Sequence, residues 1–102
     1  MRLKSQETEI IRRSVAEVFG ETTPVWVFGS RLDDDRRGGD IDLFQETALP
    51  PAERLRCRFR LLALLQERLG EQKIDLVLAA PDDPEDQDRL VVREAEAKGV
   101  RL

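Results

Sequence analysis

Apolar residues recur at helical spacing in three segments of the chain. Ser5–Phe19 carries one apolar stripe and has acidic residues in its first turn, which favour the positive end of a helix. Pro51–Leu69 is the strongest helical segment: proline opens it, Gly70 follows it, and its apolar positions form two stripes. Asp83–Lys98 begins with an N-cap aspartate, a proline and acidic residues, so the pattern predicts one final helix there.

Three shorter apolar runs between these segments predict β-strands. Val25–Phe28 is a continuous run with β-branched and aromatic residues, as in a buried strand. Asp40–Gln45 alternates between two faces, and Lys73–Ala79 is the third run. The polar stretch Asp33–Arg37 predicts a short helix or turn. The order is therefore α-β-α-β-α-β-α, which predicts an α/β (α+β) fold with a small mixed β-sheet and flanking helices.

Length and composition fit one small domain. We expect the 102 residues to form a single domain, residues 1–102, with one modest core. No stretch approaches the roughly 18 apolar residues of a membrane helix, and the polar N-terminus lacks the apolar region of a signal peptide. The single cysteine, Cys57, excludes an internal disulfide framework. We therefore expect a cytoplasmic protein without membrane contact.

The charge distribution limits the choice of partners. The net charge is −4 and the isoelectric point is near 4.9, so the general basic surface of a nucleic-acid-binding protein is absent. Four arginines alternate along the strongest predicted helix and form two ridges on it: Arg54, Arg56, Arg58 and Arg60. Solvated side chains that cover apolar surface are the favoured interpretation of this series over a nucleic-acid patch.

The predicted strands carry three carboxylates that suit metal binding. Asp40 and Asp42 stand two positions apart on one strand, so their side chains share a face at about 6.6 to 6.8 Å. They can converge on two metal ions that lie about 3.5 to 4 Å apart. Asp75 is the only carboxylate inside the third strand. Mg²⁺ prefers such oxygen ligands together with substrate phosphates, and bound cations relieve the cost of burying carboxylates.

A glycine and a serine follow the first strand. Gly29 lets the backbone approach a phosphate closely, and exposed N–H groups with the Ser30 hydroxyl can bind the anion. If this turn and the aspartates converge, the end of the first strand and the starts of the other two meet at one edge of the sheet. The second strand then runs antiparallel to the first and parallel to the third.

Together these motifs resemble the DNA polymerase beta-like nucleotidyltransferase superfamily. The shared pattern is a strand, Gly29-Ser30, a short helix, a strand with Asp40 and Asp42, and Asp75 on a later strand. The short chain is similar to the minimal nucleotidyltransferase (MNT) branch. The resemblance implies the polymerase beta-like fold and an Mg²⁺-dependent enzyme that transfers a nucleoside monophosphate, with AMP from ATP favoured, to a hydroxyl acceptor.

The resemblance also implies roles for individual residues. Three carboxylates would be catalytic residues and ligands of two Mg²⁺ ions: Asp40, Asp42 and Asp75. Three residues would bind the nucleotide: Gly29, Ser30 and Arg31. Asp75 would also accept the proton of the acceptor hydroxyl, since the chain has no histidine to act as a base.

A protein partner follows from the resemblance as well. Minimal nucleotidyltransferases in prokaryotes are commonly paired with a helical HEPN-domain protein as a toxin–antitoxin system. The resemblance therefore implies that this chain is the antitoxin and that the acceptor hydroxyl lies on a HEPN toxin. The two-stripe helix Pro51–Leu69 fits such an interface as well as it fits a helix covered by its own domain. A homo-oligomer stays open.

Two alternative functions stay open. The chain could be an inactive MNT antitoxin that neutralises a HEPN ribonuclease by binding alone. Nucleotidylation of a small molecule is the weakest alternative, because related enzymes carry an extra acceptor domain for which this chain has no room. The run Asp33-Asp34-Asp35 would weaken triphosphate binding if it faced the site, although a solvated helix face is the favoured interpretation.

Overall fold

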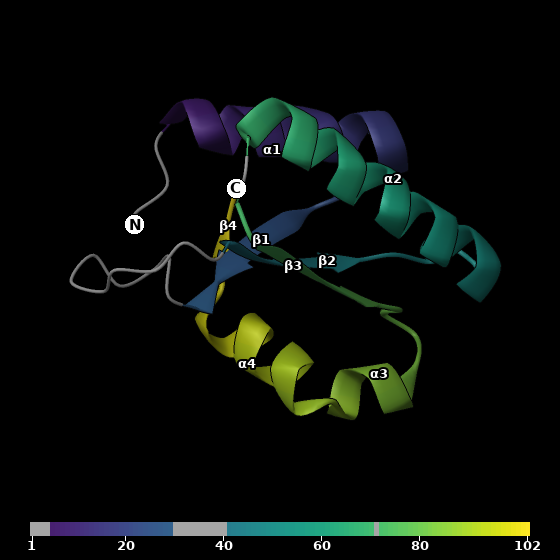
Figure 1. Ribbon diagram of the computed structural model, residues 1–102. Helices are drawn as coiled ribbons and strands as arrows, with labels where there is room; N and C mark the ends of the chain where they lie inside the picture. Colours follow the sequence, from purple (N-terminus) through teal and green to yellow (C-terminus); the bar gives the residue numbers. More distant parts are fainter. Residues whose placement is uncertain (1–4, 30–40, 71) are drawn as a thin grey trace.

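A computed structural model describes residues 5–29, 41–70 and 72–102, in which helices cover a mixed β-sheet (Figure 1). The described elements are α1 (Ser5–Phe19), β1 (Val25–Phe28), β2 (Ile41–Glu46), α2 (Pro51–Leu69), β3 (Ile74–Ala79), α3 (Pro84–Asp88), α4 (Leu90–Lys98) and β4 (Val100–Arg101). The predicted fold class, a small mixed sheet with flanking helices, is therefore confirmed. The predicted short helix or turn at Asp33–Arg37 lies outside the described residues.

The strands are arranged in the order β3-β2-β1-β4. β2 runs antiparallel to β1 and parallel to β3, and β4 pairs antiparallel with β1 on its other side. These directions are the ones that convergence of the glycine–serine turn and the aspartates requires. The end of β1 and the starts of β2 and β3 consequently lie at one edge of the sheet.

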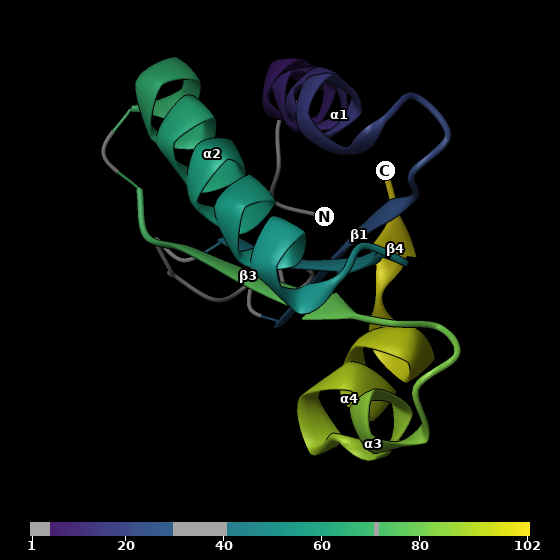
Figure 2. The same ribbon diagram turned by 90° about the vertical axis from the view of Figure 1, so that its right-hand side faces the viewer.

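Helices cover both faces of the sheet (Figure 2). Ile41 and Leu43 of β2 pack with Leu61 and Leu65 of α2 in one core cluster, to which α1 also contributes. On the other face, Phe44 packs in a second cluster with residues of α4. The alternation of β2 between two faces is thus satisfied by a separate helical layer on each side.

The final helical segment and the end of the chain differ from the prediction. The predicted single helix over Asp83–Lys98 was wrong, because the backbone at Arg89 is extended (φ −62°, ψ 133°) and separates α3 from α4. The Arg89 guanidinium donates a 3.0 Å hydrogen bond to the Leu78 carbonyl of β3. The two-residue strand β4 was not predicted at all. Its pairing with β1 is a long-range contact that local periodicity does not reveal.

Arginine side chains protect β3, which is an edge strand of the sheet. Arg58 of α2 donates to the Leu76 carbonyl at 2.6 Å, and Arg89 donates to the next outward carbonyl, that of Leu78. Exposed edge strands favour association with other strands, so capping these carbonyls shields the edge. None of the helices in residues 5–29, 41–70 and 72–102 combines the length and apolar character that crossing a membrane requires.

The Asp86 side chain links α3 to the rest of the fold through hydrogen bonds and ion pairs. Its carboxylate accepts a 2.8 Å hydrogen bond from the Ala80 backbone N–H and pairs with Arg54 of α2 at 3.3 Å and with Arg89 at 3.4 Å. The hydrogen bond from Ala80, followed by those from the two arginines, lowers the pKa of Asp86 below its ordinary value. A single half-buried carboxylate therefore joins α3 to α2 and to the residue that follows β3.

We expect Asp86→Asn to lower the free energy of unfolding by about 2 kcal/mol near neutral pH, since charged hydrogen bonds contribute roughly 1.5 to 3 kcal/mol. Because the folded pKa is lowered, this stabilisation is present above the ordinary aspartate pKa of about 3.9 and is lost as the pH falls through the lowered value. Urea unfolding over this pH range measures the difference. Asp88→Asn, an exposed position of the same helix, is the matched control. An Asp86→Asn deficit that persists undiminished at the acid end would contradict the assignment.

Candidate active site

One row of residues crosses the sheet near the edge where β1 ends and β2 and β3 begin. Phe28 of β1 lies opposite Asp42 of β2, and Asp42 is in register with Asp75 of β3. In-register residues on neighbouring strands point to the same face, and neighbouring strands lie about 4.8 Å apart. The sheet therefore holds the side chains of Asp42 and Asp75 next to each other.

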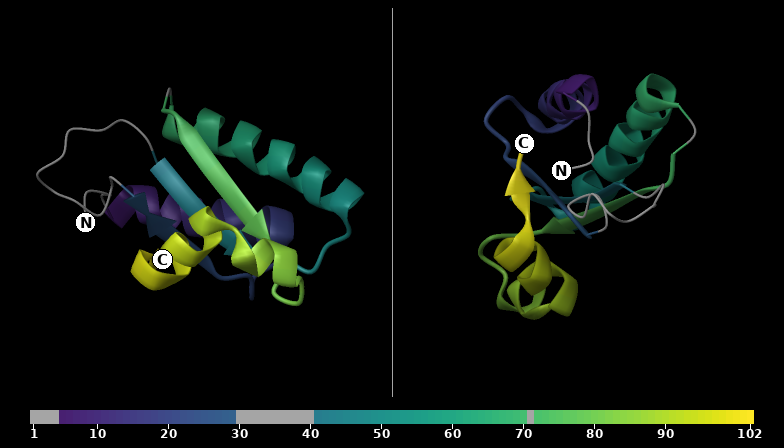
Figure 3. Two further views of the ribbon diagram at one scale, coloured as in Figure 1. Left: turned by 90° about the horizontal axis from the view of Figure 1, so that it is seen from below. Right: turned by 90° about the vertical axis from the view of Figure 1, so that its left-hand side faces the viewer.

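These two carboxylates lie on the same face of the sheet as Phe44 and Val77. The helices α3 and α4 lie on that side of the sheet (Figure 3). Phe44 and Val77, two residues further along β2 and β3, belong to or pack against the core cluster of that face. Asp42 is half-buried and Asp75 is exposed. The pair thus stands at the rim of an apolar layer, with one side toward the core and the other toward solvent.

Gly29 lies directly against the Asp42 carboxylate. Its φ is +78°, a conformation that residues with side chains rarely adopt. A Cβ built at Gly29 would lie 3.2 Å from Cγ of Asp42 and still closer to its Oδ2. The carboxylate occupies the space that any side chain at position 29 would need, so the turn after β1 and the start of β2 are in contact.

Buried aromatic residues lie next to Asp42 on the same face of the sheet and form an apolar wall there. Phe28, opposite Asp42, is only 6% exposed, and Phe44 is almost fully buried. The rings of Trp26 and Phe44 pack with centroids 5.5 Å apart. These side chains place apolar surface beside Asp42, and a lower local dielectric would strengthen the interaction of its carboxylate with a cation.

The electrostatics of the pair favour a bound cation. Like charges directly opposite each other on neighbouring strands are destabilising. Among the residues that the structure describes, Asp75 has no ion-pair partner. A divalent cation would offset this repulsion, and Mg²⁺ binds through one or two protein carboxylates while keeping waters and substrate phosphates as its other ligands. Asp42 and Asp75 therefore fit the predicted Mg²⁺ site.

Half of the predicted site residues can be placed. The structure brings three of them to one edge of the sheet: Gly29, Asp42 and Asp75. The other three lie outside the described residues: Ser30, Arg31 and Asp40. Within the described ranges no group of three potential metal ligands occurs, and only two of the three predicted ligands belong to those ranges.

Sequence reasoning missed two features of this edge. It assigned Gly29 to phosphate binding and gave no sign that its missing side chain makes room for Asp42. It also predicted the buried strand Val25–Phe28 without indicating that Trp26 lies on the carboxylate face next to Phe44. Both features depend on which residues face each other across strands, and composition gives no signal of that. The chain matches no protein-family model and no curated protein.

We expect Gly29→Ala to destabilise the protein by about 2 kcal/mol or more, because the added Cβ combines a strained positive φ with overlap on Asp42. Gly70→Ala is a matched control, since Gly70 has a φ of +83° but open space where its Cβ would be. Urea unfolding of both variants separates the overlap from the backbone strain. Equal losses in the two variants would show that Asp42 does not occupy the space beside Gly29.

Proposed function

We propose that this protein binds a nucleoside triphosphate with Mg²⁺ at the carboxylate edge and transfers the nucleoside monophosphate to a hydroxyl acceptor. The observation that supports the proposal is the in-register pair Asp42 and Asp75 beside the close-packed Gly29. Two neighbouring carboxylates next to a glycine turn provide the oxygen ligands that a metal–triphosphate complex needs.

Each residue has a distinct part in this proposal. Asp42 and Asp75 hold Mg²⁺, with Asp40 as the further ligand that the sequence predicts. The Gly29–Ser30 turn, with Arg31, binds the phosphates through backbone N–H groups, the serine hydroxyl and the guanidinium group. Bound Mg²⁺ would neutralise charge on the phosphates and orient the reacting phosphorus.

The exposure of Asp75 suits proton transfer. An acceptor hydroxyl can reach this carboxylate from solvent, whereas Asp42 is half-buried against the apolar wall. As the acceptor oxygen bonds to the α-phosphorus and the bond to pyrophosphate breaks, the hydroxyl proton passes to Asp75. The protein contributes mainly by positioning these groups.

Calorimetric titration of ATP in the presence and absence of Mg²⁺ tests the nucleotide site. We expect binding that requires Mg²⁺ and that falls at least about tenfold in Asp42→Asn, because a charged metal ligand is lost. Asp88→Asn, which removes an exposed carboxylate far along the chain, should bind like the wild type. Metal-independent binding, or equal binding by the Asp42→Asn protein, would contradict the proposed site.

The partner that we propose is a helical HEPN-domain protein that carries the acceptor hydroxyl. On α2, Leu55 and Phe59 lie one turn apart and are 53% and 63% exposed. Arg56 and Arg60 are exposed beside them and have no ion pair among the described residues. We propose that this α2 surface (Leu55, Arg56, Phe59 and Arg60) contacts apolar and acidic side chains of the partner.

The same α2 surface would also serve an antitoxin that acts by contact alone. In that alternative function, the chain covers the HEPN ribonuclease and the carboxylates are not used. Neutralisation of the toxin by an Asp42→Asn/Asp75→Asn variant would favour contact alone. If that variant still forms the complex but no longer neutralises the toxin, the result would favour nucleotidyl transfer as the antitoxin mechanism. We place this reaction in the cytoplasm.

Co-purification with the HEPN-domain protein encoded beside this chain tests the partner. We expect Phe59→Glu to weaken the complex at least about tenfold, since it buries a charge in an apolar contact and faces the partner's acidic groups. Leu90→Glu is the control, because Leu90 is 83% exposed on a different helix. The absence of such a neighbouring protein, or an unchanged complex with Phe59→Glu, would contradict the proposal.

A further inference from the structure

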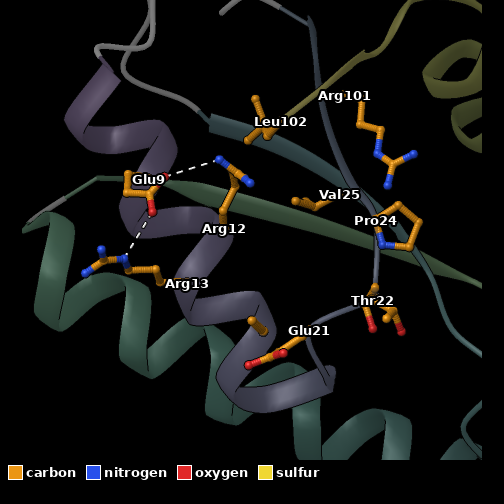
Figure 4. Close-up of a pocket in the computed structure, with 11 residues that line it drawn as sticks. Glu9, Arg12, Arg13, Glu21, Thr22, Pro24, Val25, Arg101 and Leu102 are labelled. Atoms are coloured by element: carbon orange, nitrogen blue, oxygen red, sulfur yellow. Dashed lines mark hydrogen bonds and ion pairs between the residues drawn. The ribbon is translucent and has the colours of Figure 1, made fainter.

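A charged cavity lies away from the carboxylate edge. It opens between α1, the turn after α1, the start of β1 and the residues of β4, and its volume is about 250 Å³ (Figure 4). Pro24 and Val25 line it at the start of β1, whereas Gly29 and the carboxylates lie beyond the other end of that strand. The cavity is therefore independent of the proposed nucleotide site.

Arginine side chains reach this cavity from elements that are far apart in the sequence. Arg12 comes from α1 and Arg101 from β4. Figure 4 shows their guanidinium groups on either side of Leu102 and Val25. Two guanidinium groups with an apolar surface between them form a site that can contact both the charged and the apolar part of one ligand.

Among the described residues, the ion pairs around the cavity involve Arg12 and Arg13 but not Arg101. Arg12 and Arg13 share one carboxylate, that of Glu9, at 3.3 and 3.1 Å. Arg101 forms no ion pair within the described part of the chain. Glu21 is the other acidic side chain of the lining.

The charge of the whole chain limits the kind of anion. With a net charge of −4, the protein as a whole repels an extended polyanion such as a nucleic acid, whose binding needs many phosphate contacts. A small anion that fits inside the cavity meets mainly the local arginines. Guanidinium groups match the geometry of phosphate oxygens through paired hydrogen bonds.

We propose that this cavity binds a small phosphate monoester, with Arg12 and Arg101 donating hydrogen bonds to the phosphate and Val25 and Leu102 contacting the organic part. The cavity volume, just below the range of about 300 to 1,000 Å³ that is usual for drug-sized ligands, suits a compact molecule. The site lies outside the nucleotide-transfer machinery and does not depend on it.

Phenyl phosphate is a suitable probe, because it combines a phosphate with a small apolar ring. Isotope-labelled protein is titrated with it in the presence of EDTA, and backbone amide shifts are followed by NMR. We expect shifts at Thr22, Val25 and Arg101, and an affinity that falls about tenfold in Arg12→Gln and in Arg101→Gln as charged hydrogen bonds are lost. Arg101→Lys, which keeps the charge, should lose less than Arg101→Gln.

Two variants serve as controls. Arg93→Gln removes an exposed arginine of α4 and should leave the affinity unchanged, and Asp42→Asn should also leave it unchanged because the two sites are separate. The proposal is overturned if shifts are absent from the cavity or if Arg93→Gln weakens binding as much as Arg101→Gln. Tighter binding of a single-stranded RNA oligonucleotide than of phenyl phosphate at these residues would also overturn it.

Discussion

The pairing of β2 with β3 is the constraint on which the site depends. Parallel pairing places Asp42 beside Asp75, and antiparallel pairing with β1 places Phe28 and Gly29 against Asp42. The pairing of the three strands thus brings two carboxylates side by side, next to the buried Phe28.

Two helical layers make this register rigid. A slip of one residue would turn Ile41 and Leu43 away from α1 and α2 and would move Asp42 into their core. In the second layer, α4 covers Phe44, and the same slip would turn Phe44 away from α4. The positions of the two carboxylates are therefore fixed by burial of their neighbours in the sequence.

Local patterns predicted the parts of the fold that local physics determines. The bounds of α1 and α2 followed from caps, glycines and apolar periodicity, and the strand directions followed from the requirement that Gly29 meet the aspartates. The break at Arg89 and the strand β4 could not be predicted, since each depends on contacts with a distant strand. The spacing of the alternating arginines also does not reveal their different environments. Arg58 donates a hydrogen bond to a carbonyl of β3, whereas Arg56 and Arg60 face solvent.

The most direct test of the account is the position of a bound divalent cation. Mn²⁺ can be titrated into isotope-labelled protein while paramagnetic broadening of the backbone amides is measured. If the paired carboxylates hold the cation, the amides of Gly29, Asp42 and Asp75 broaden first, and an Asp42→Asn/Asp75→Asn variant loses this effect. Broadening centred on the acidic residues of α3, or unchanged in the variant, would contradict the claim that the paired carboxylates form a metal site.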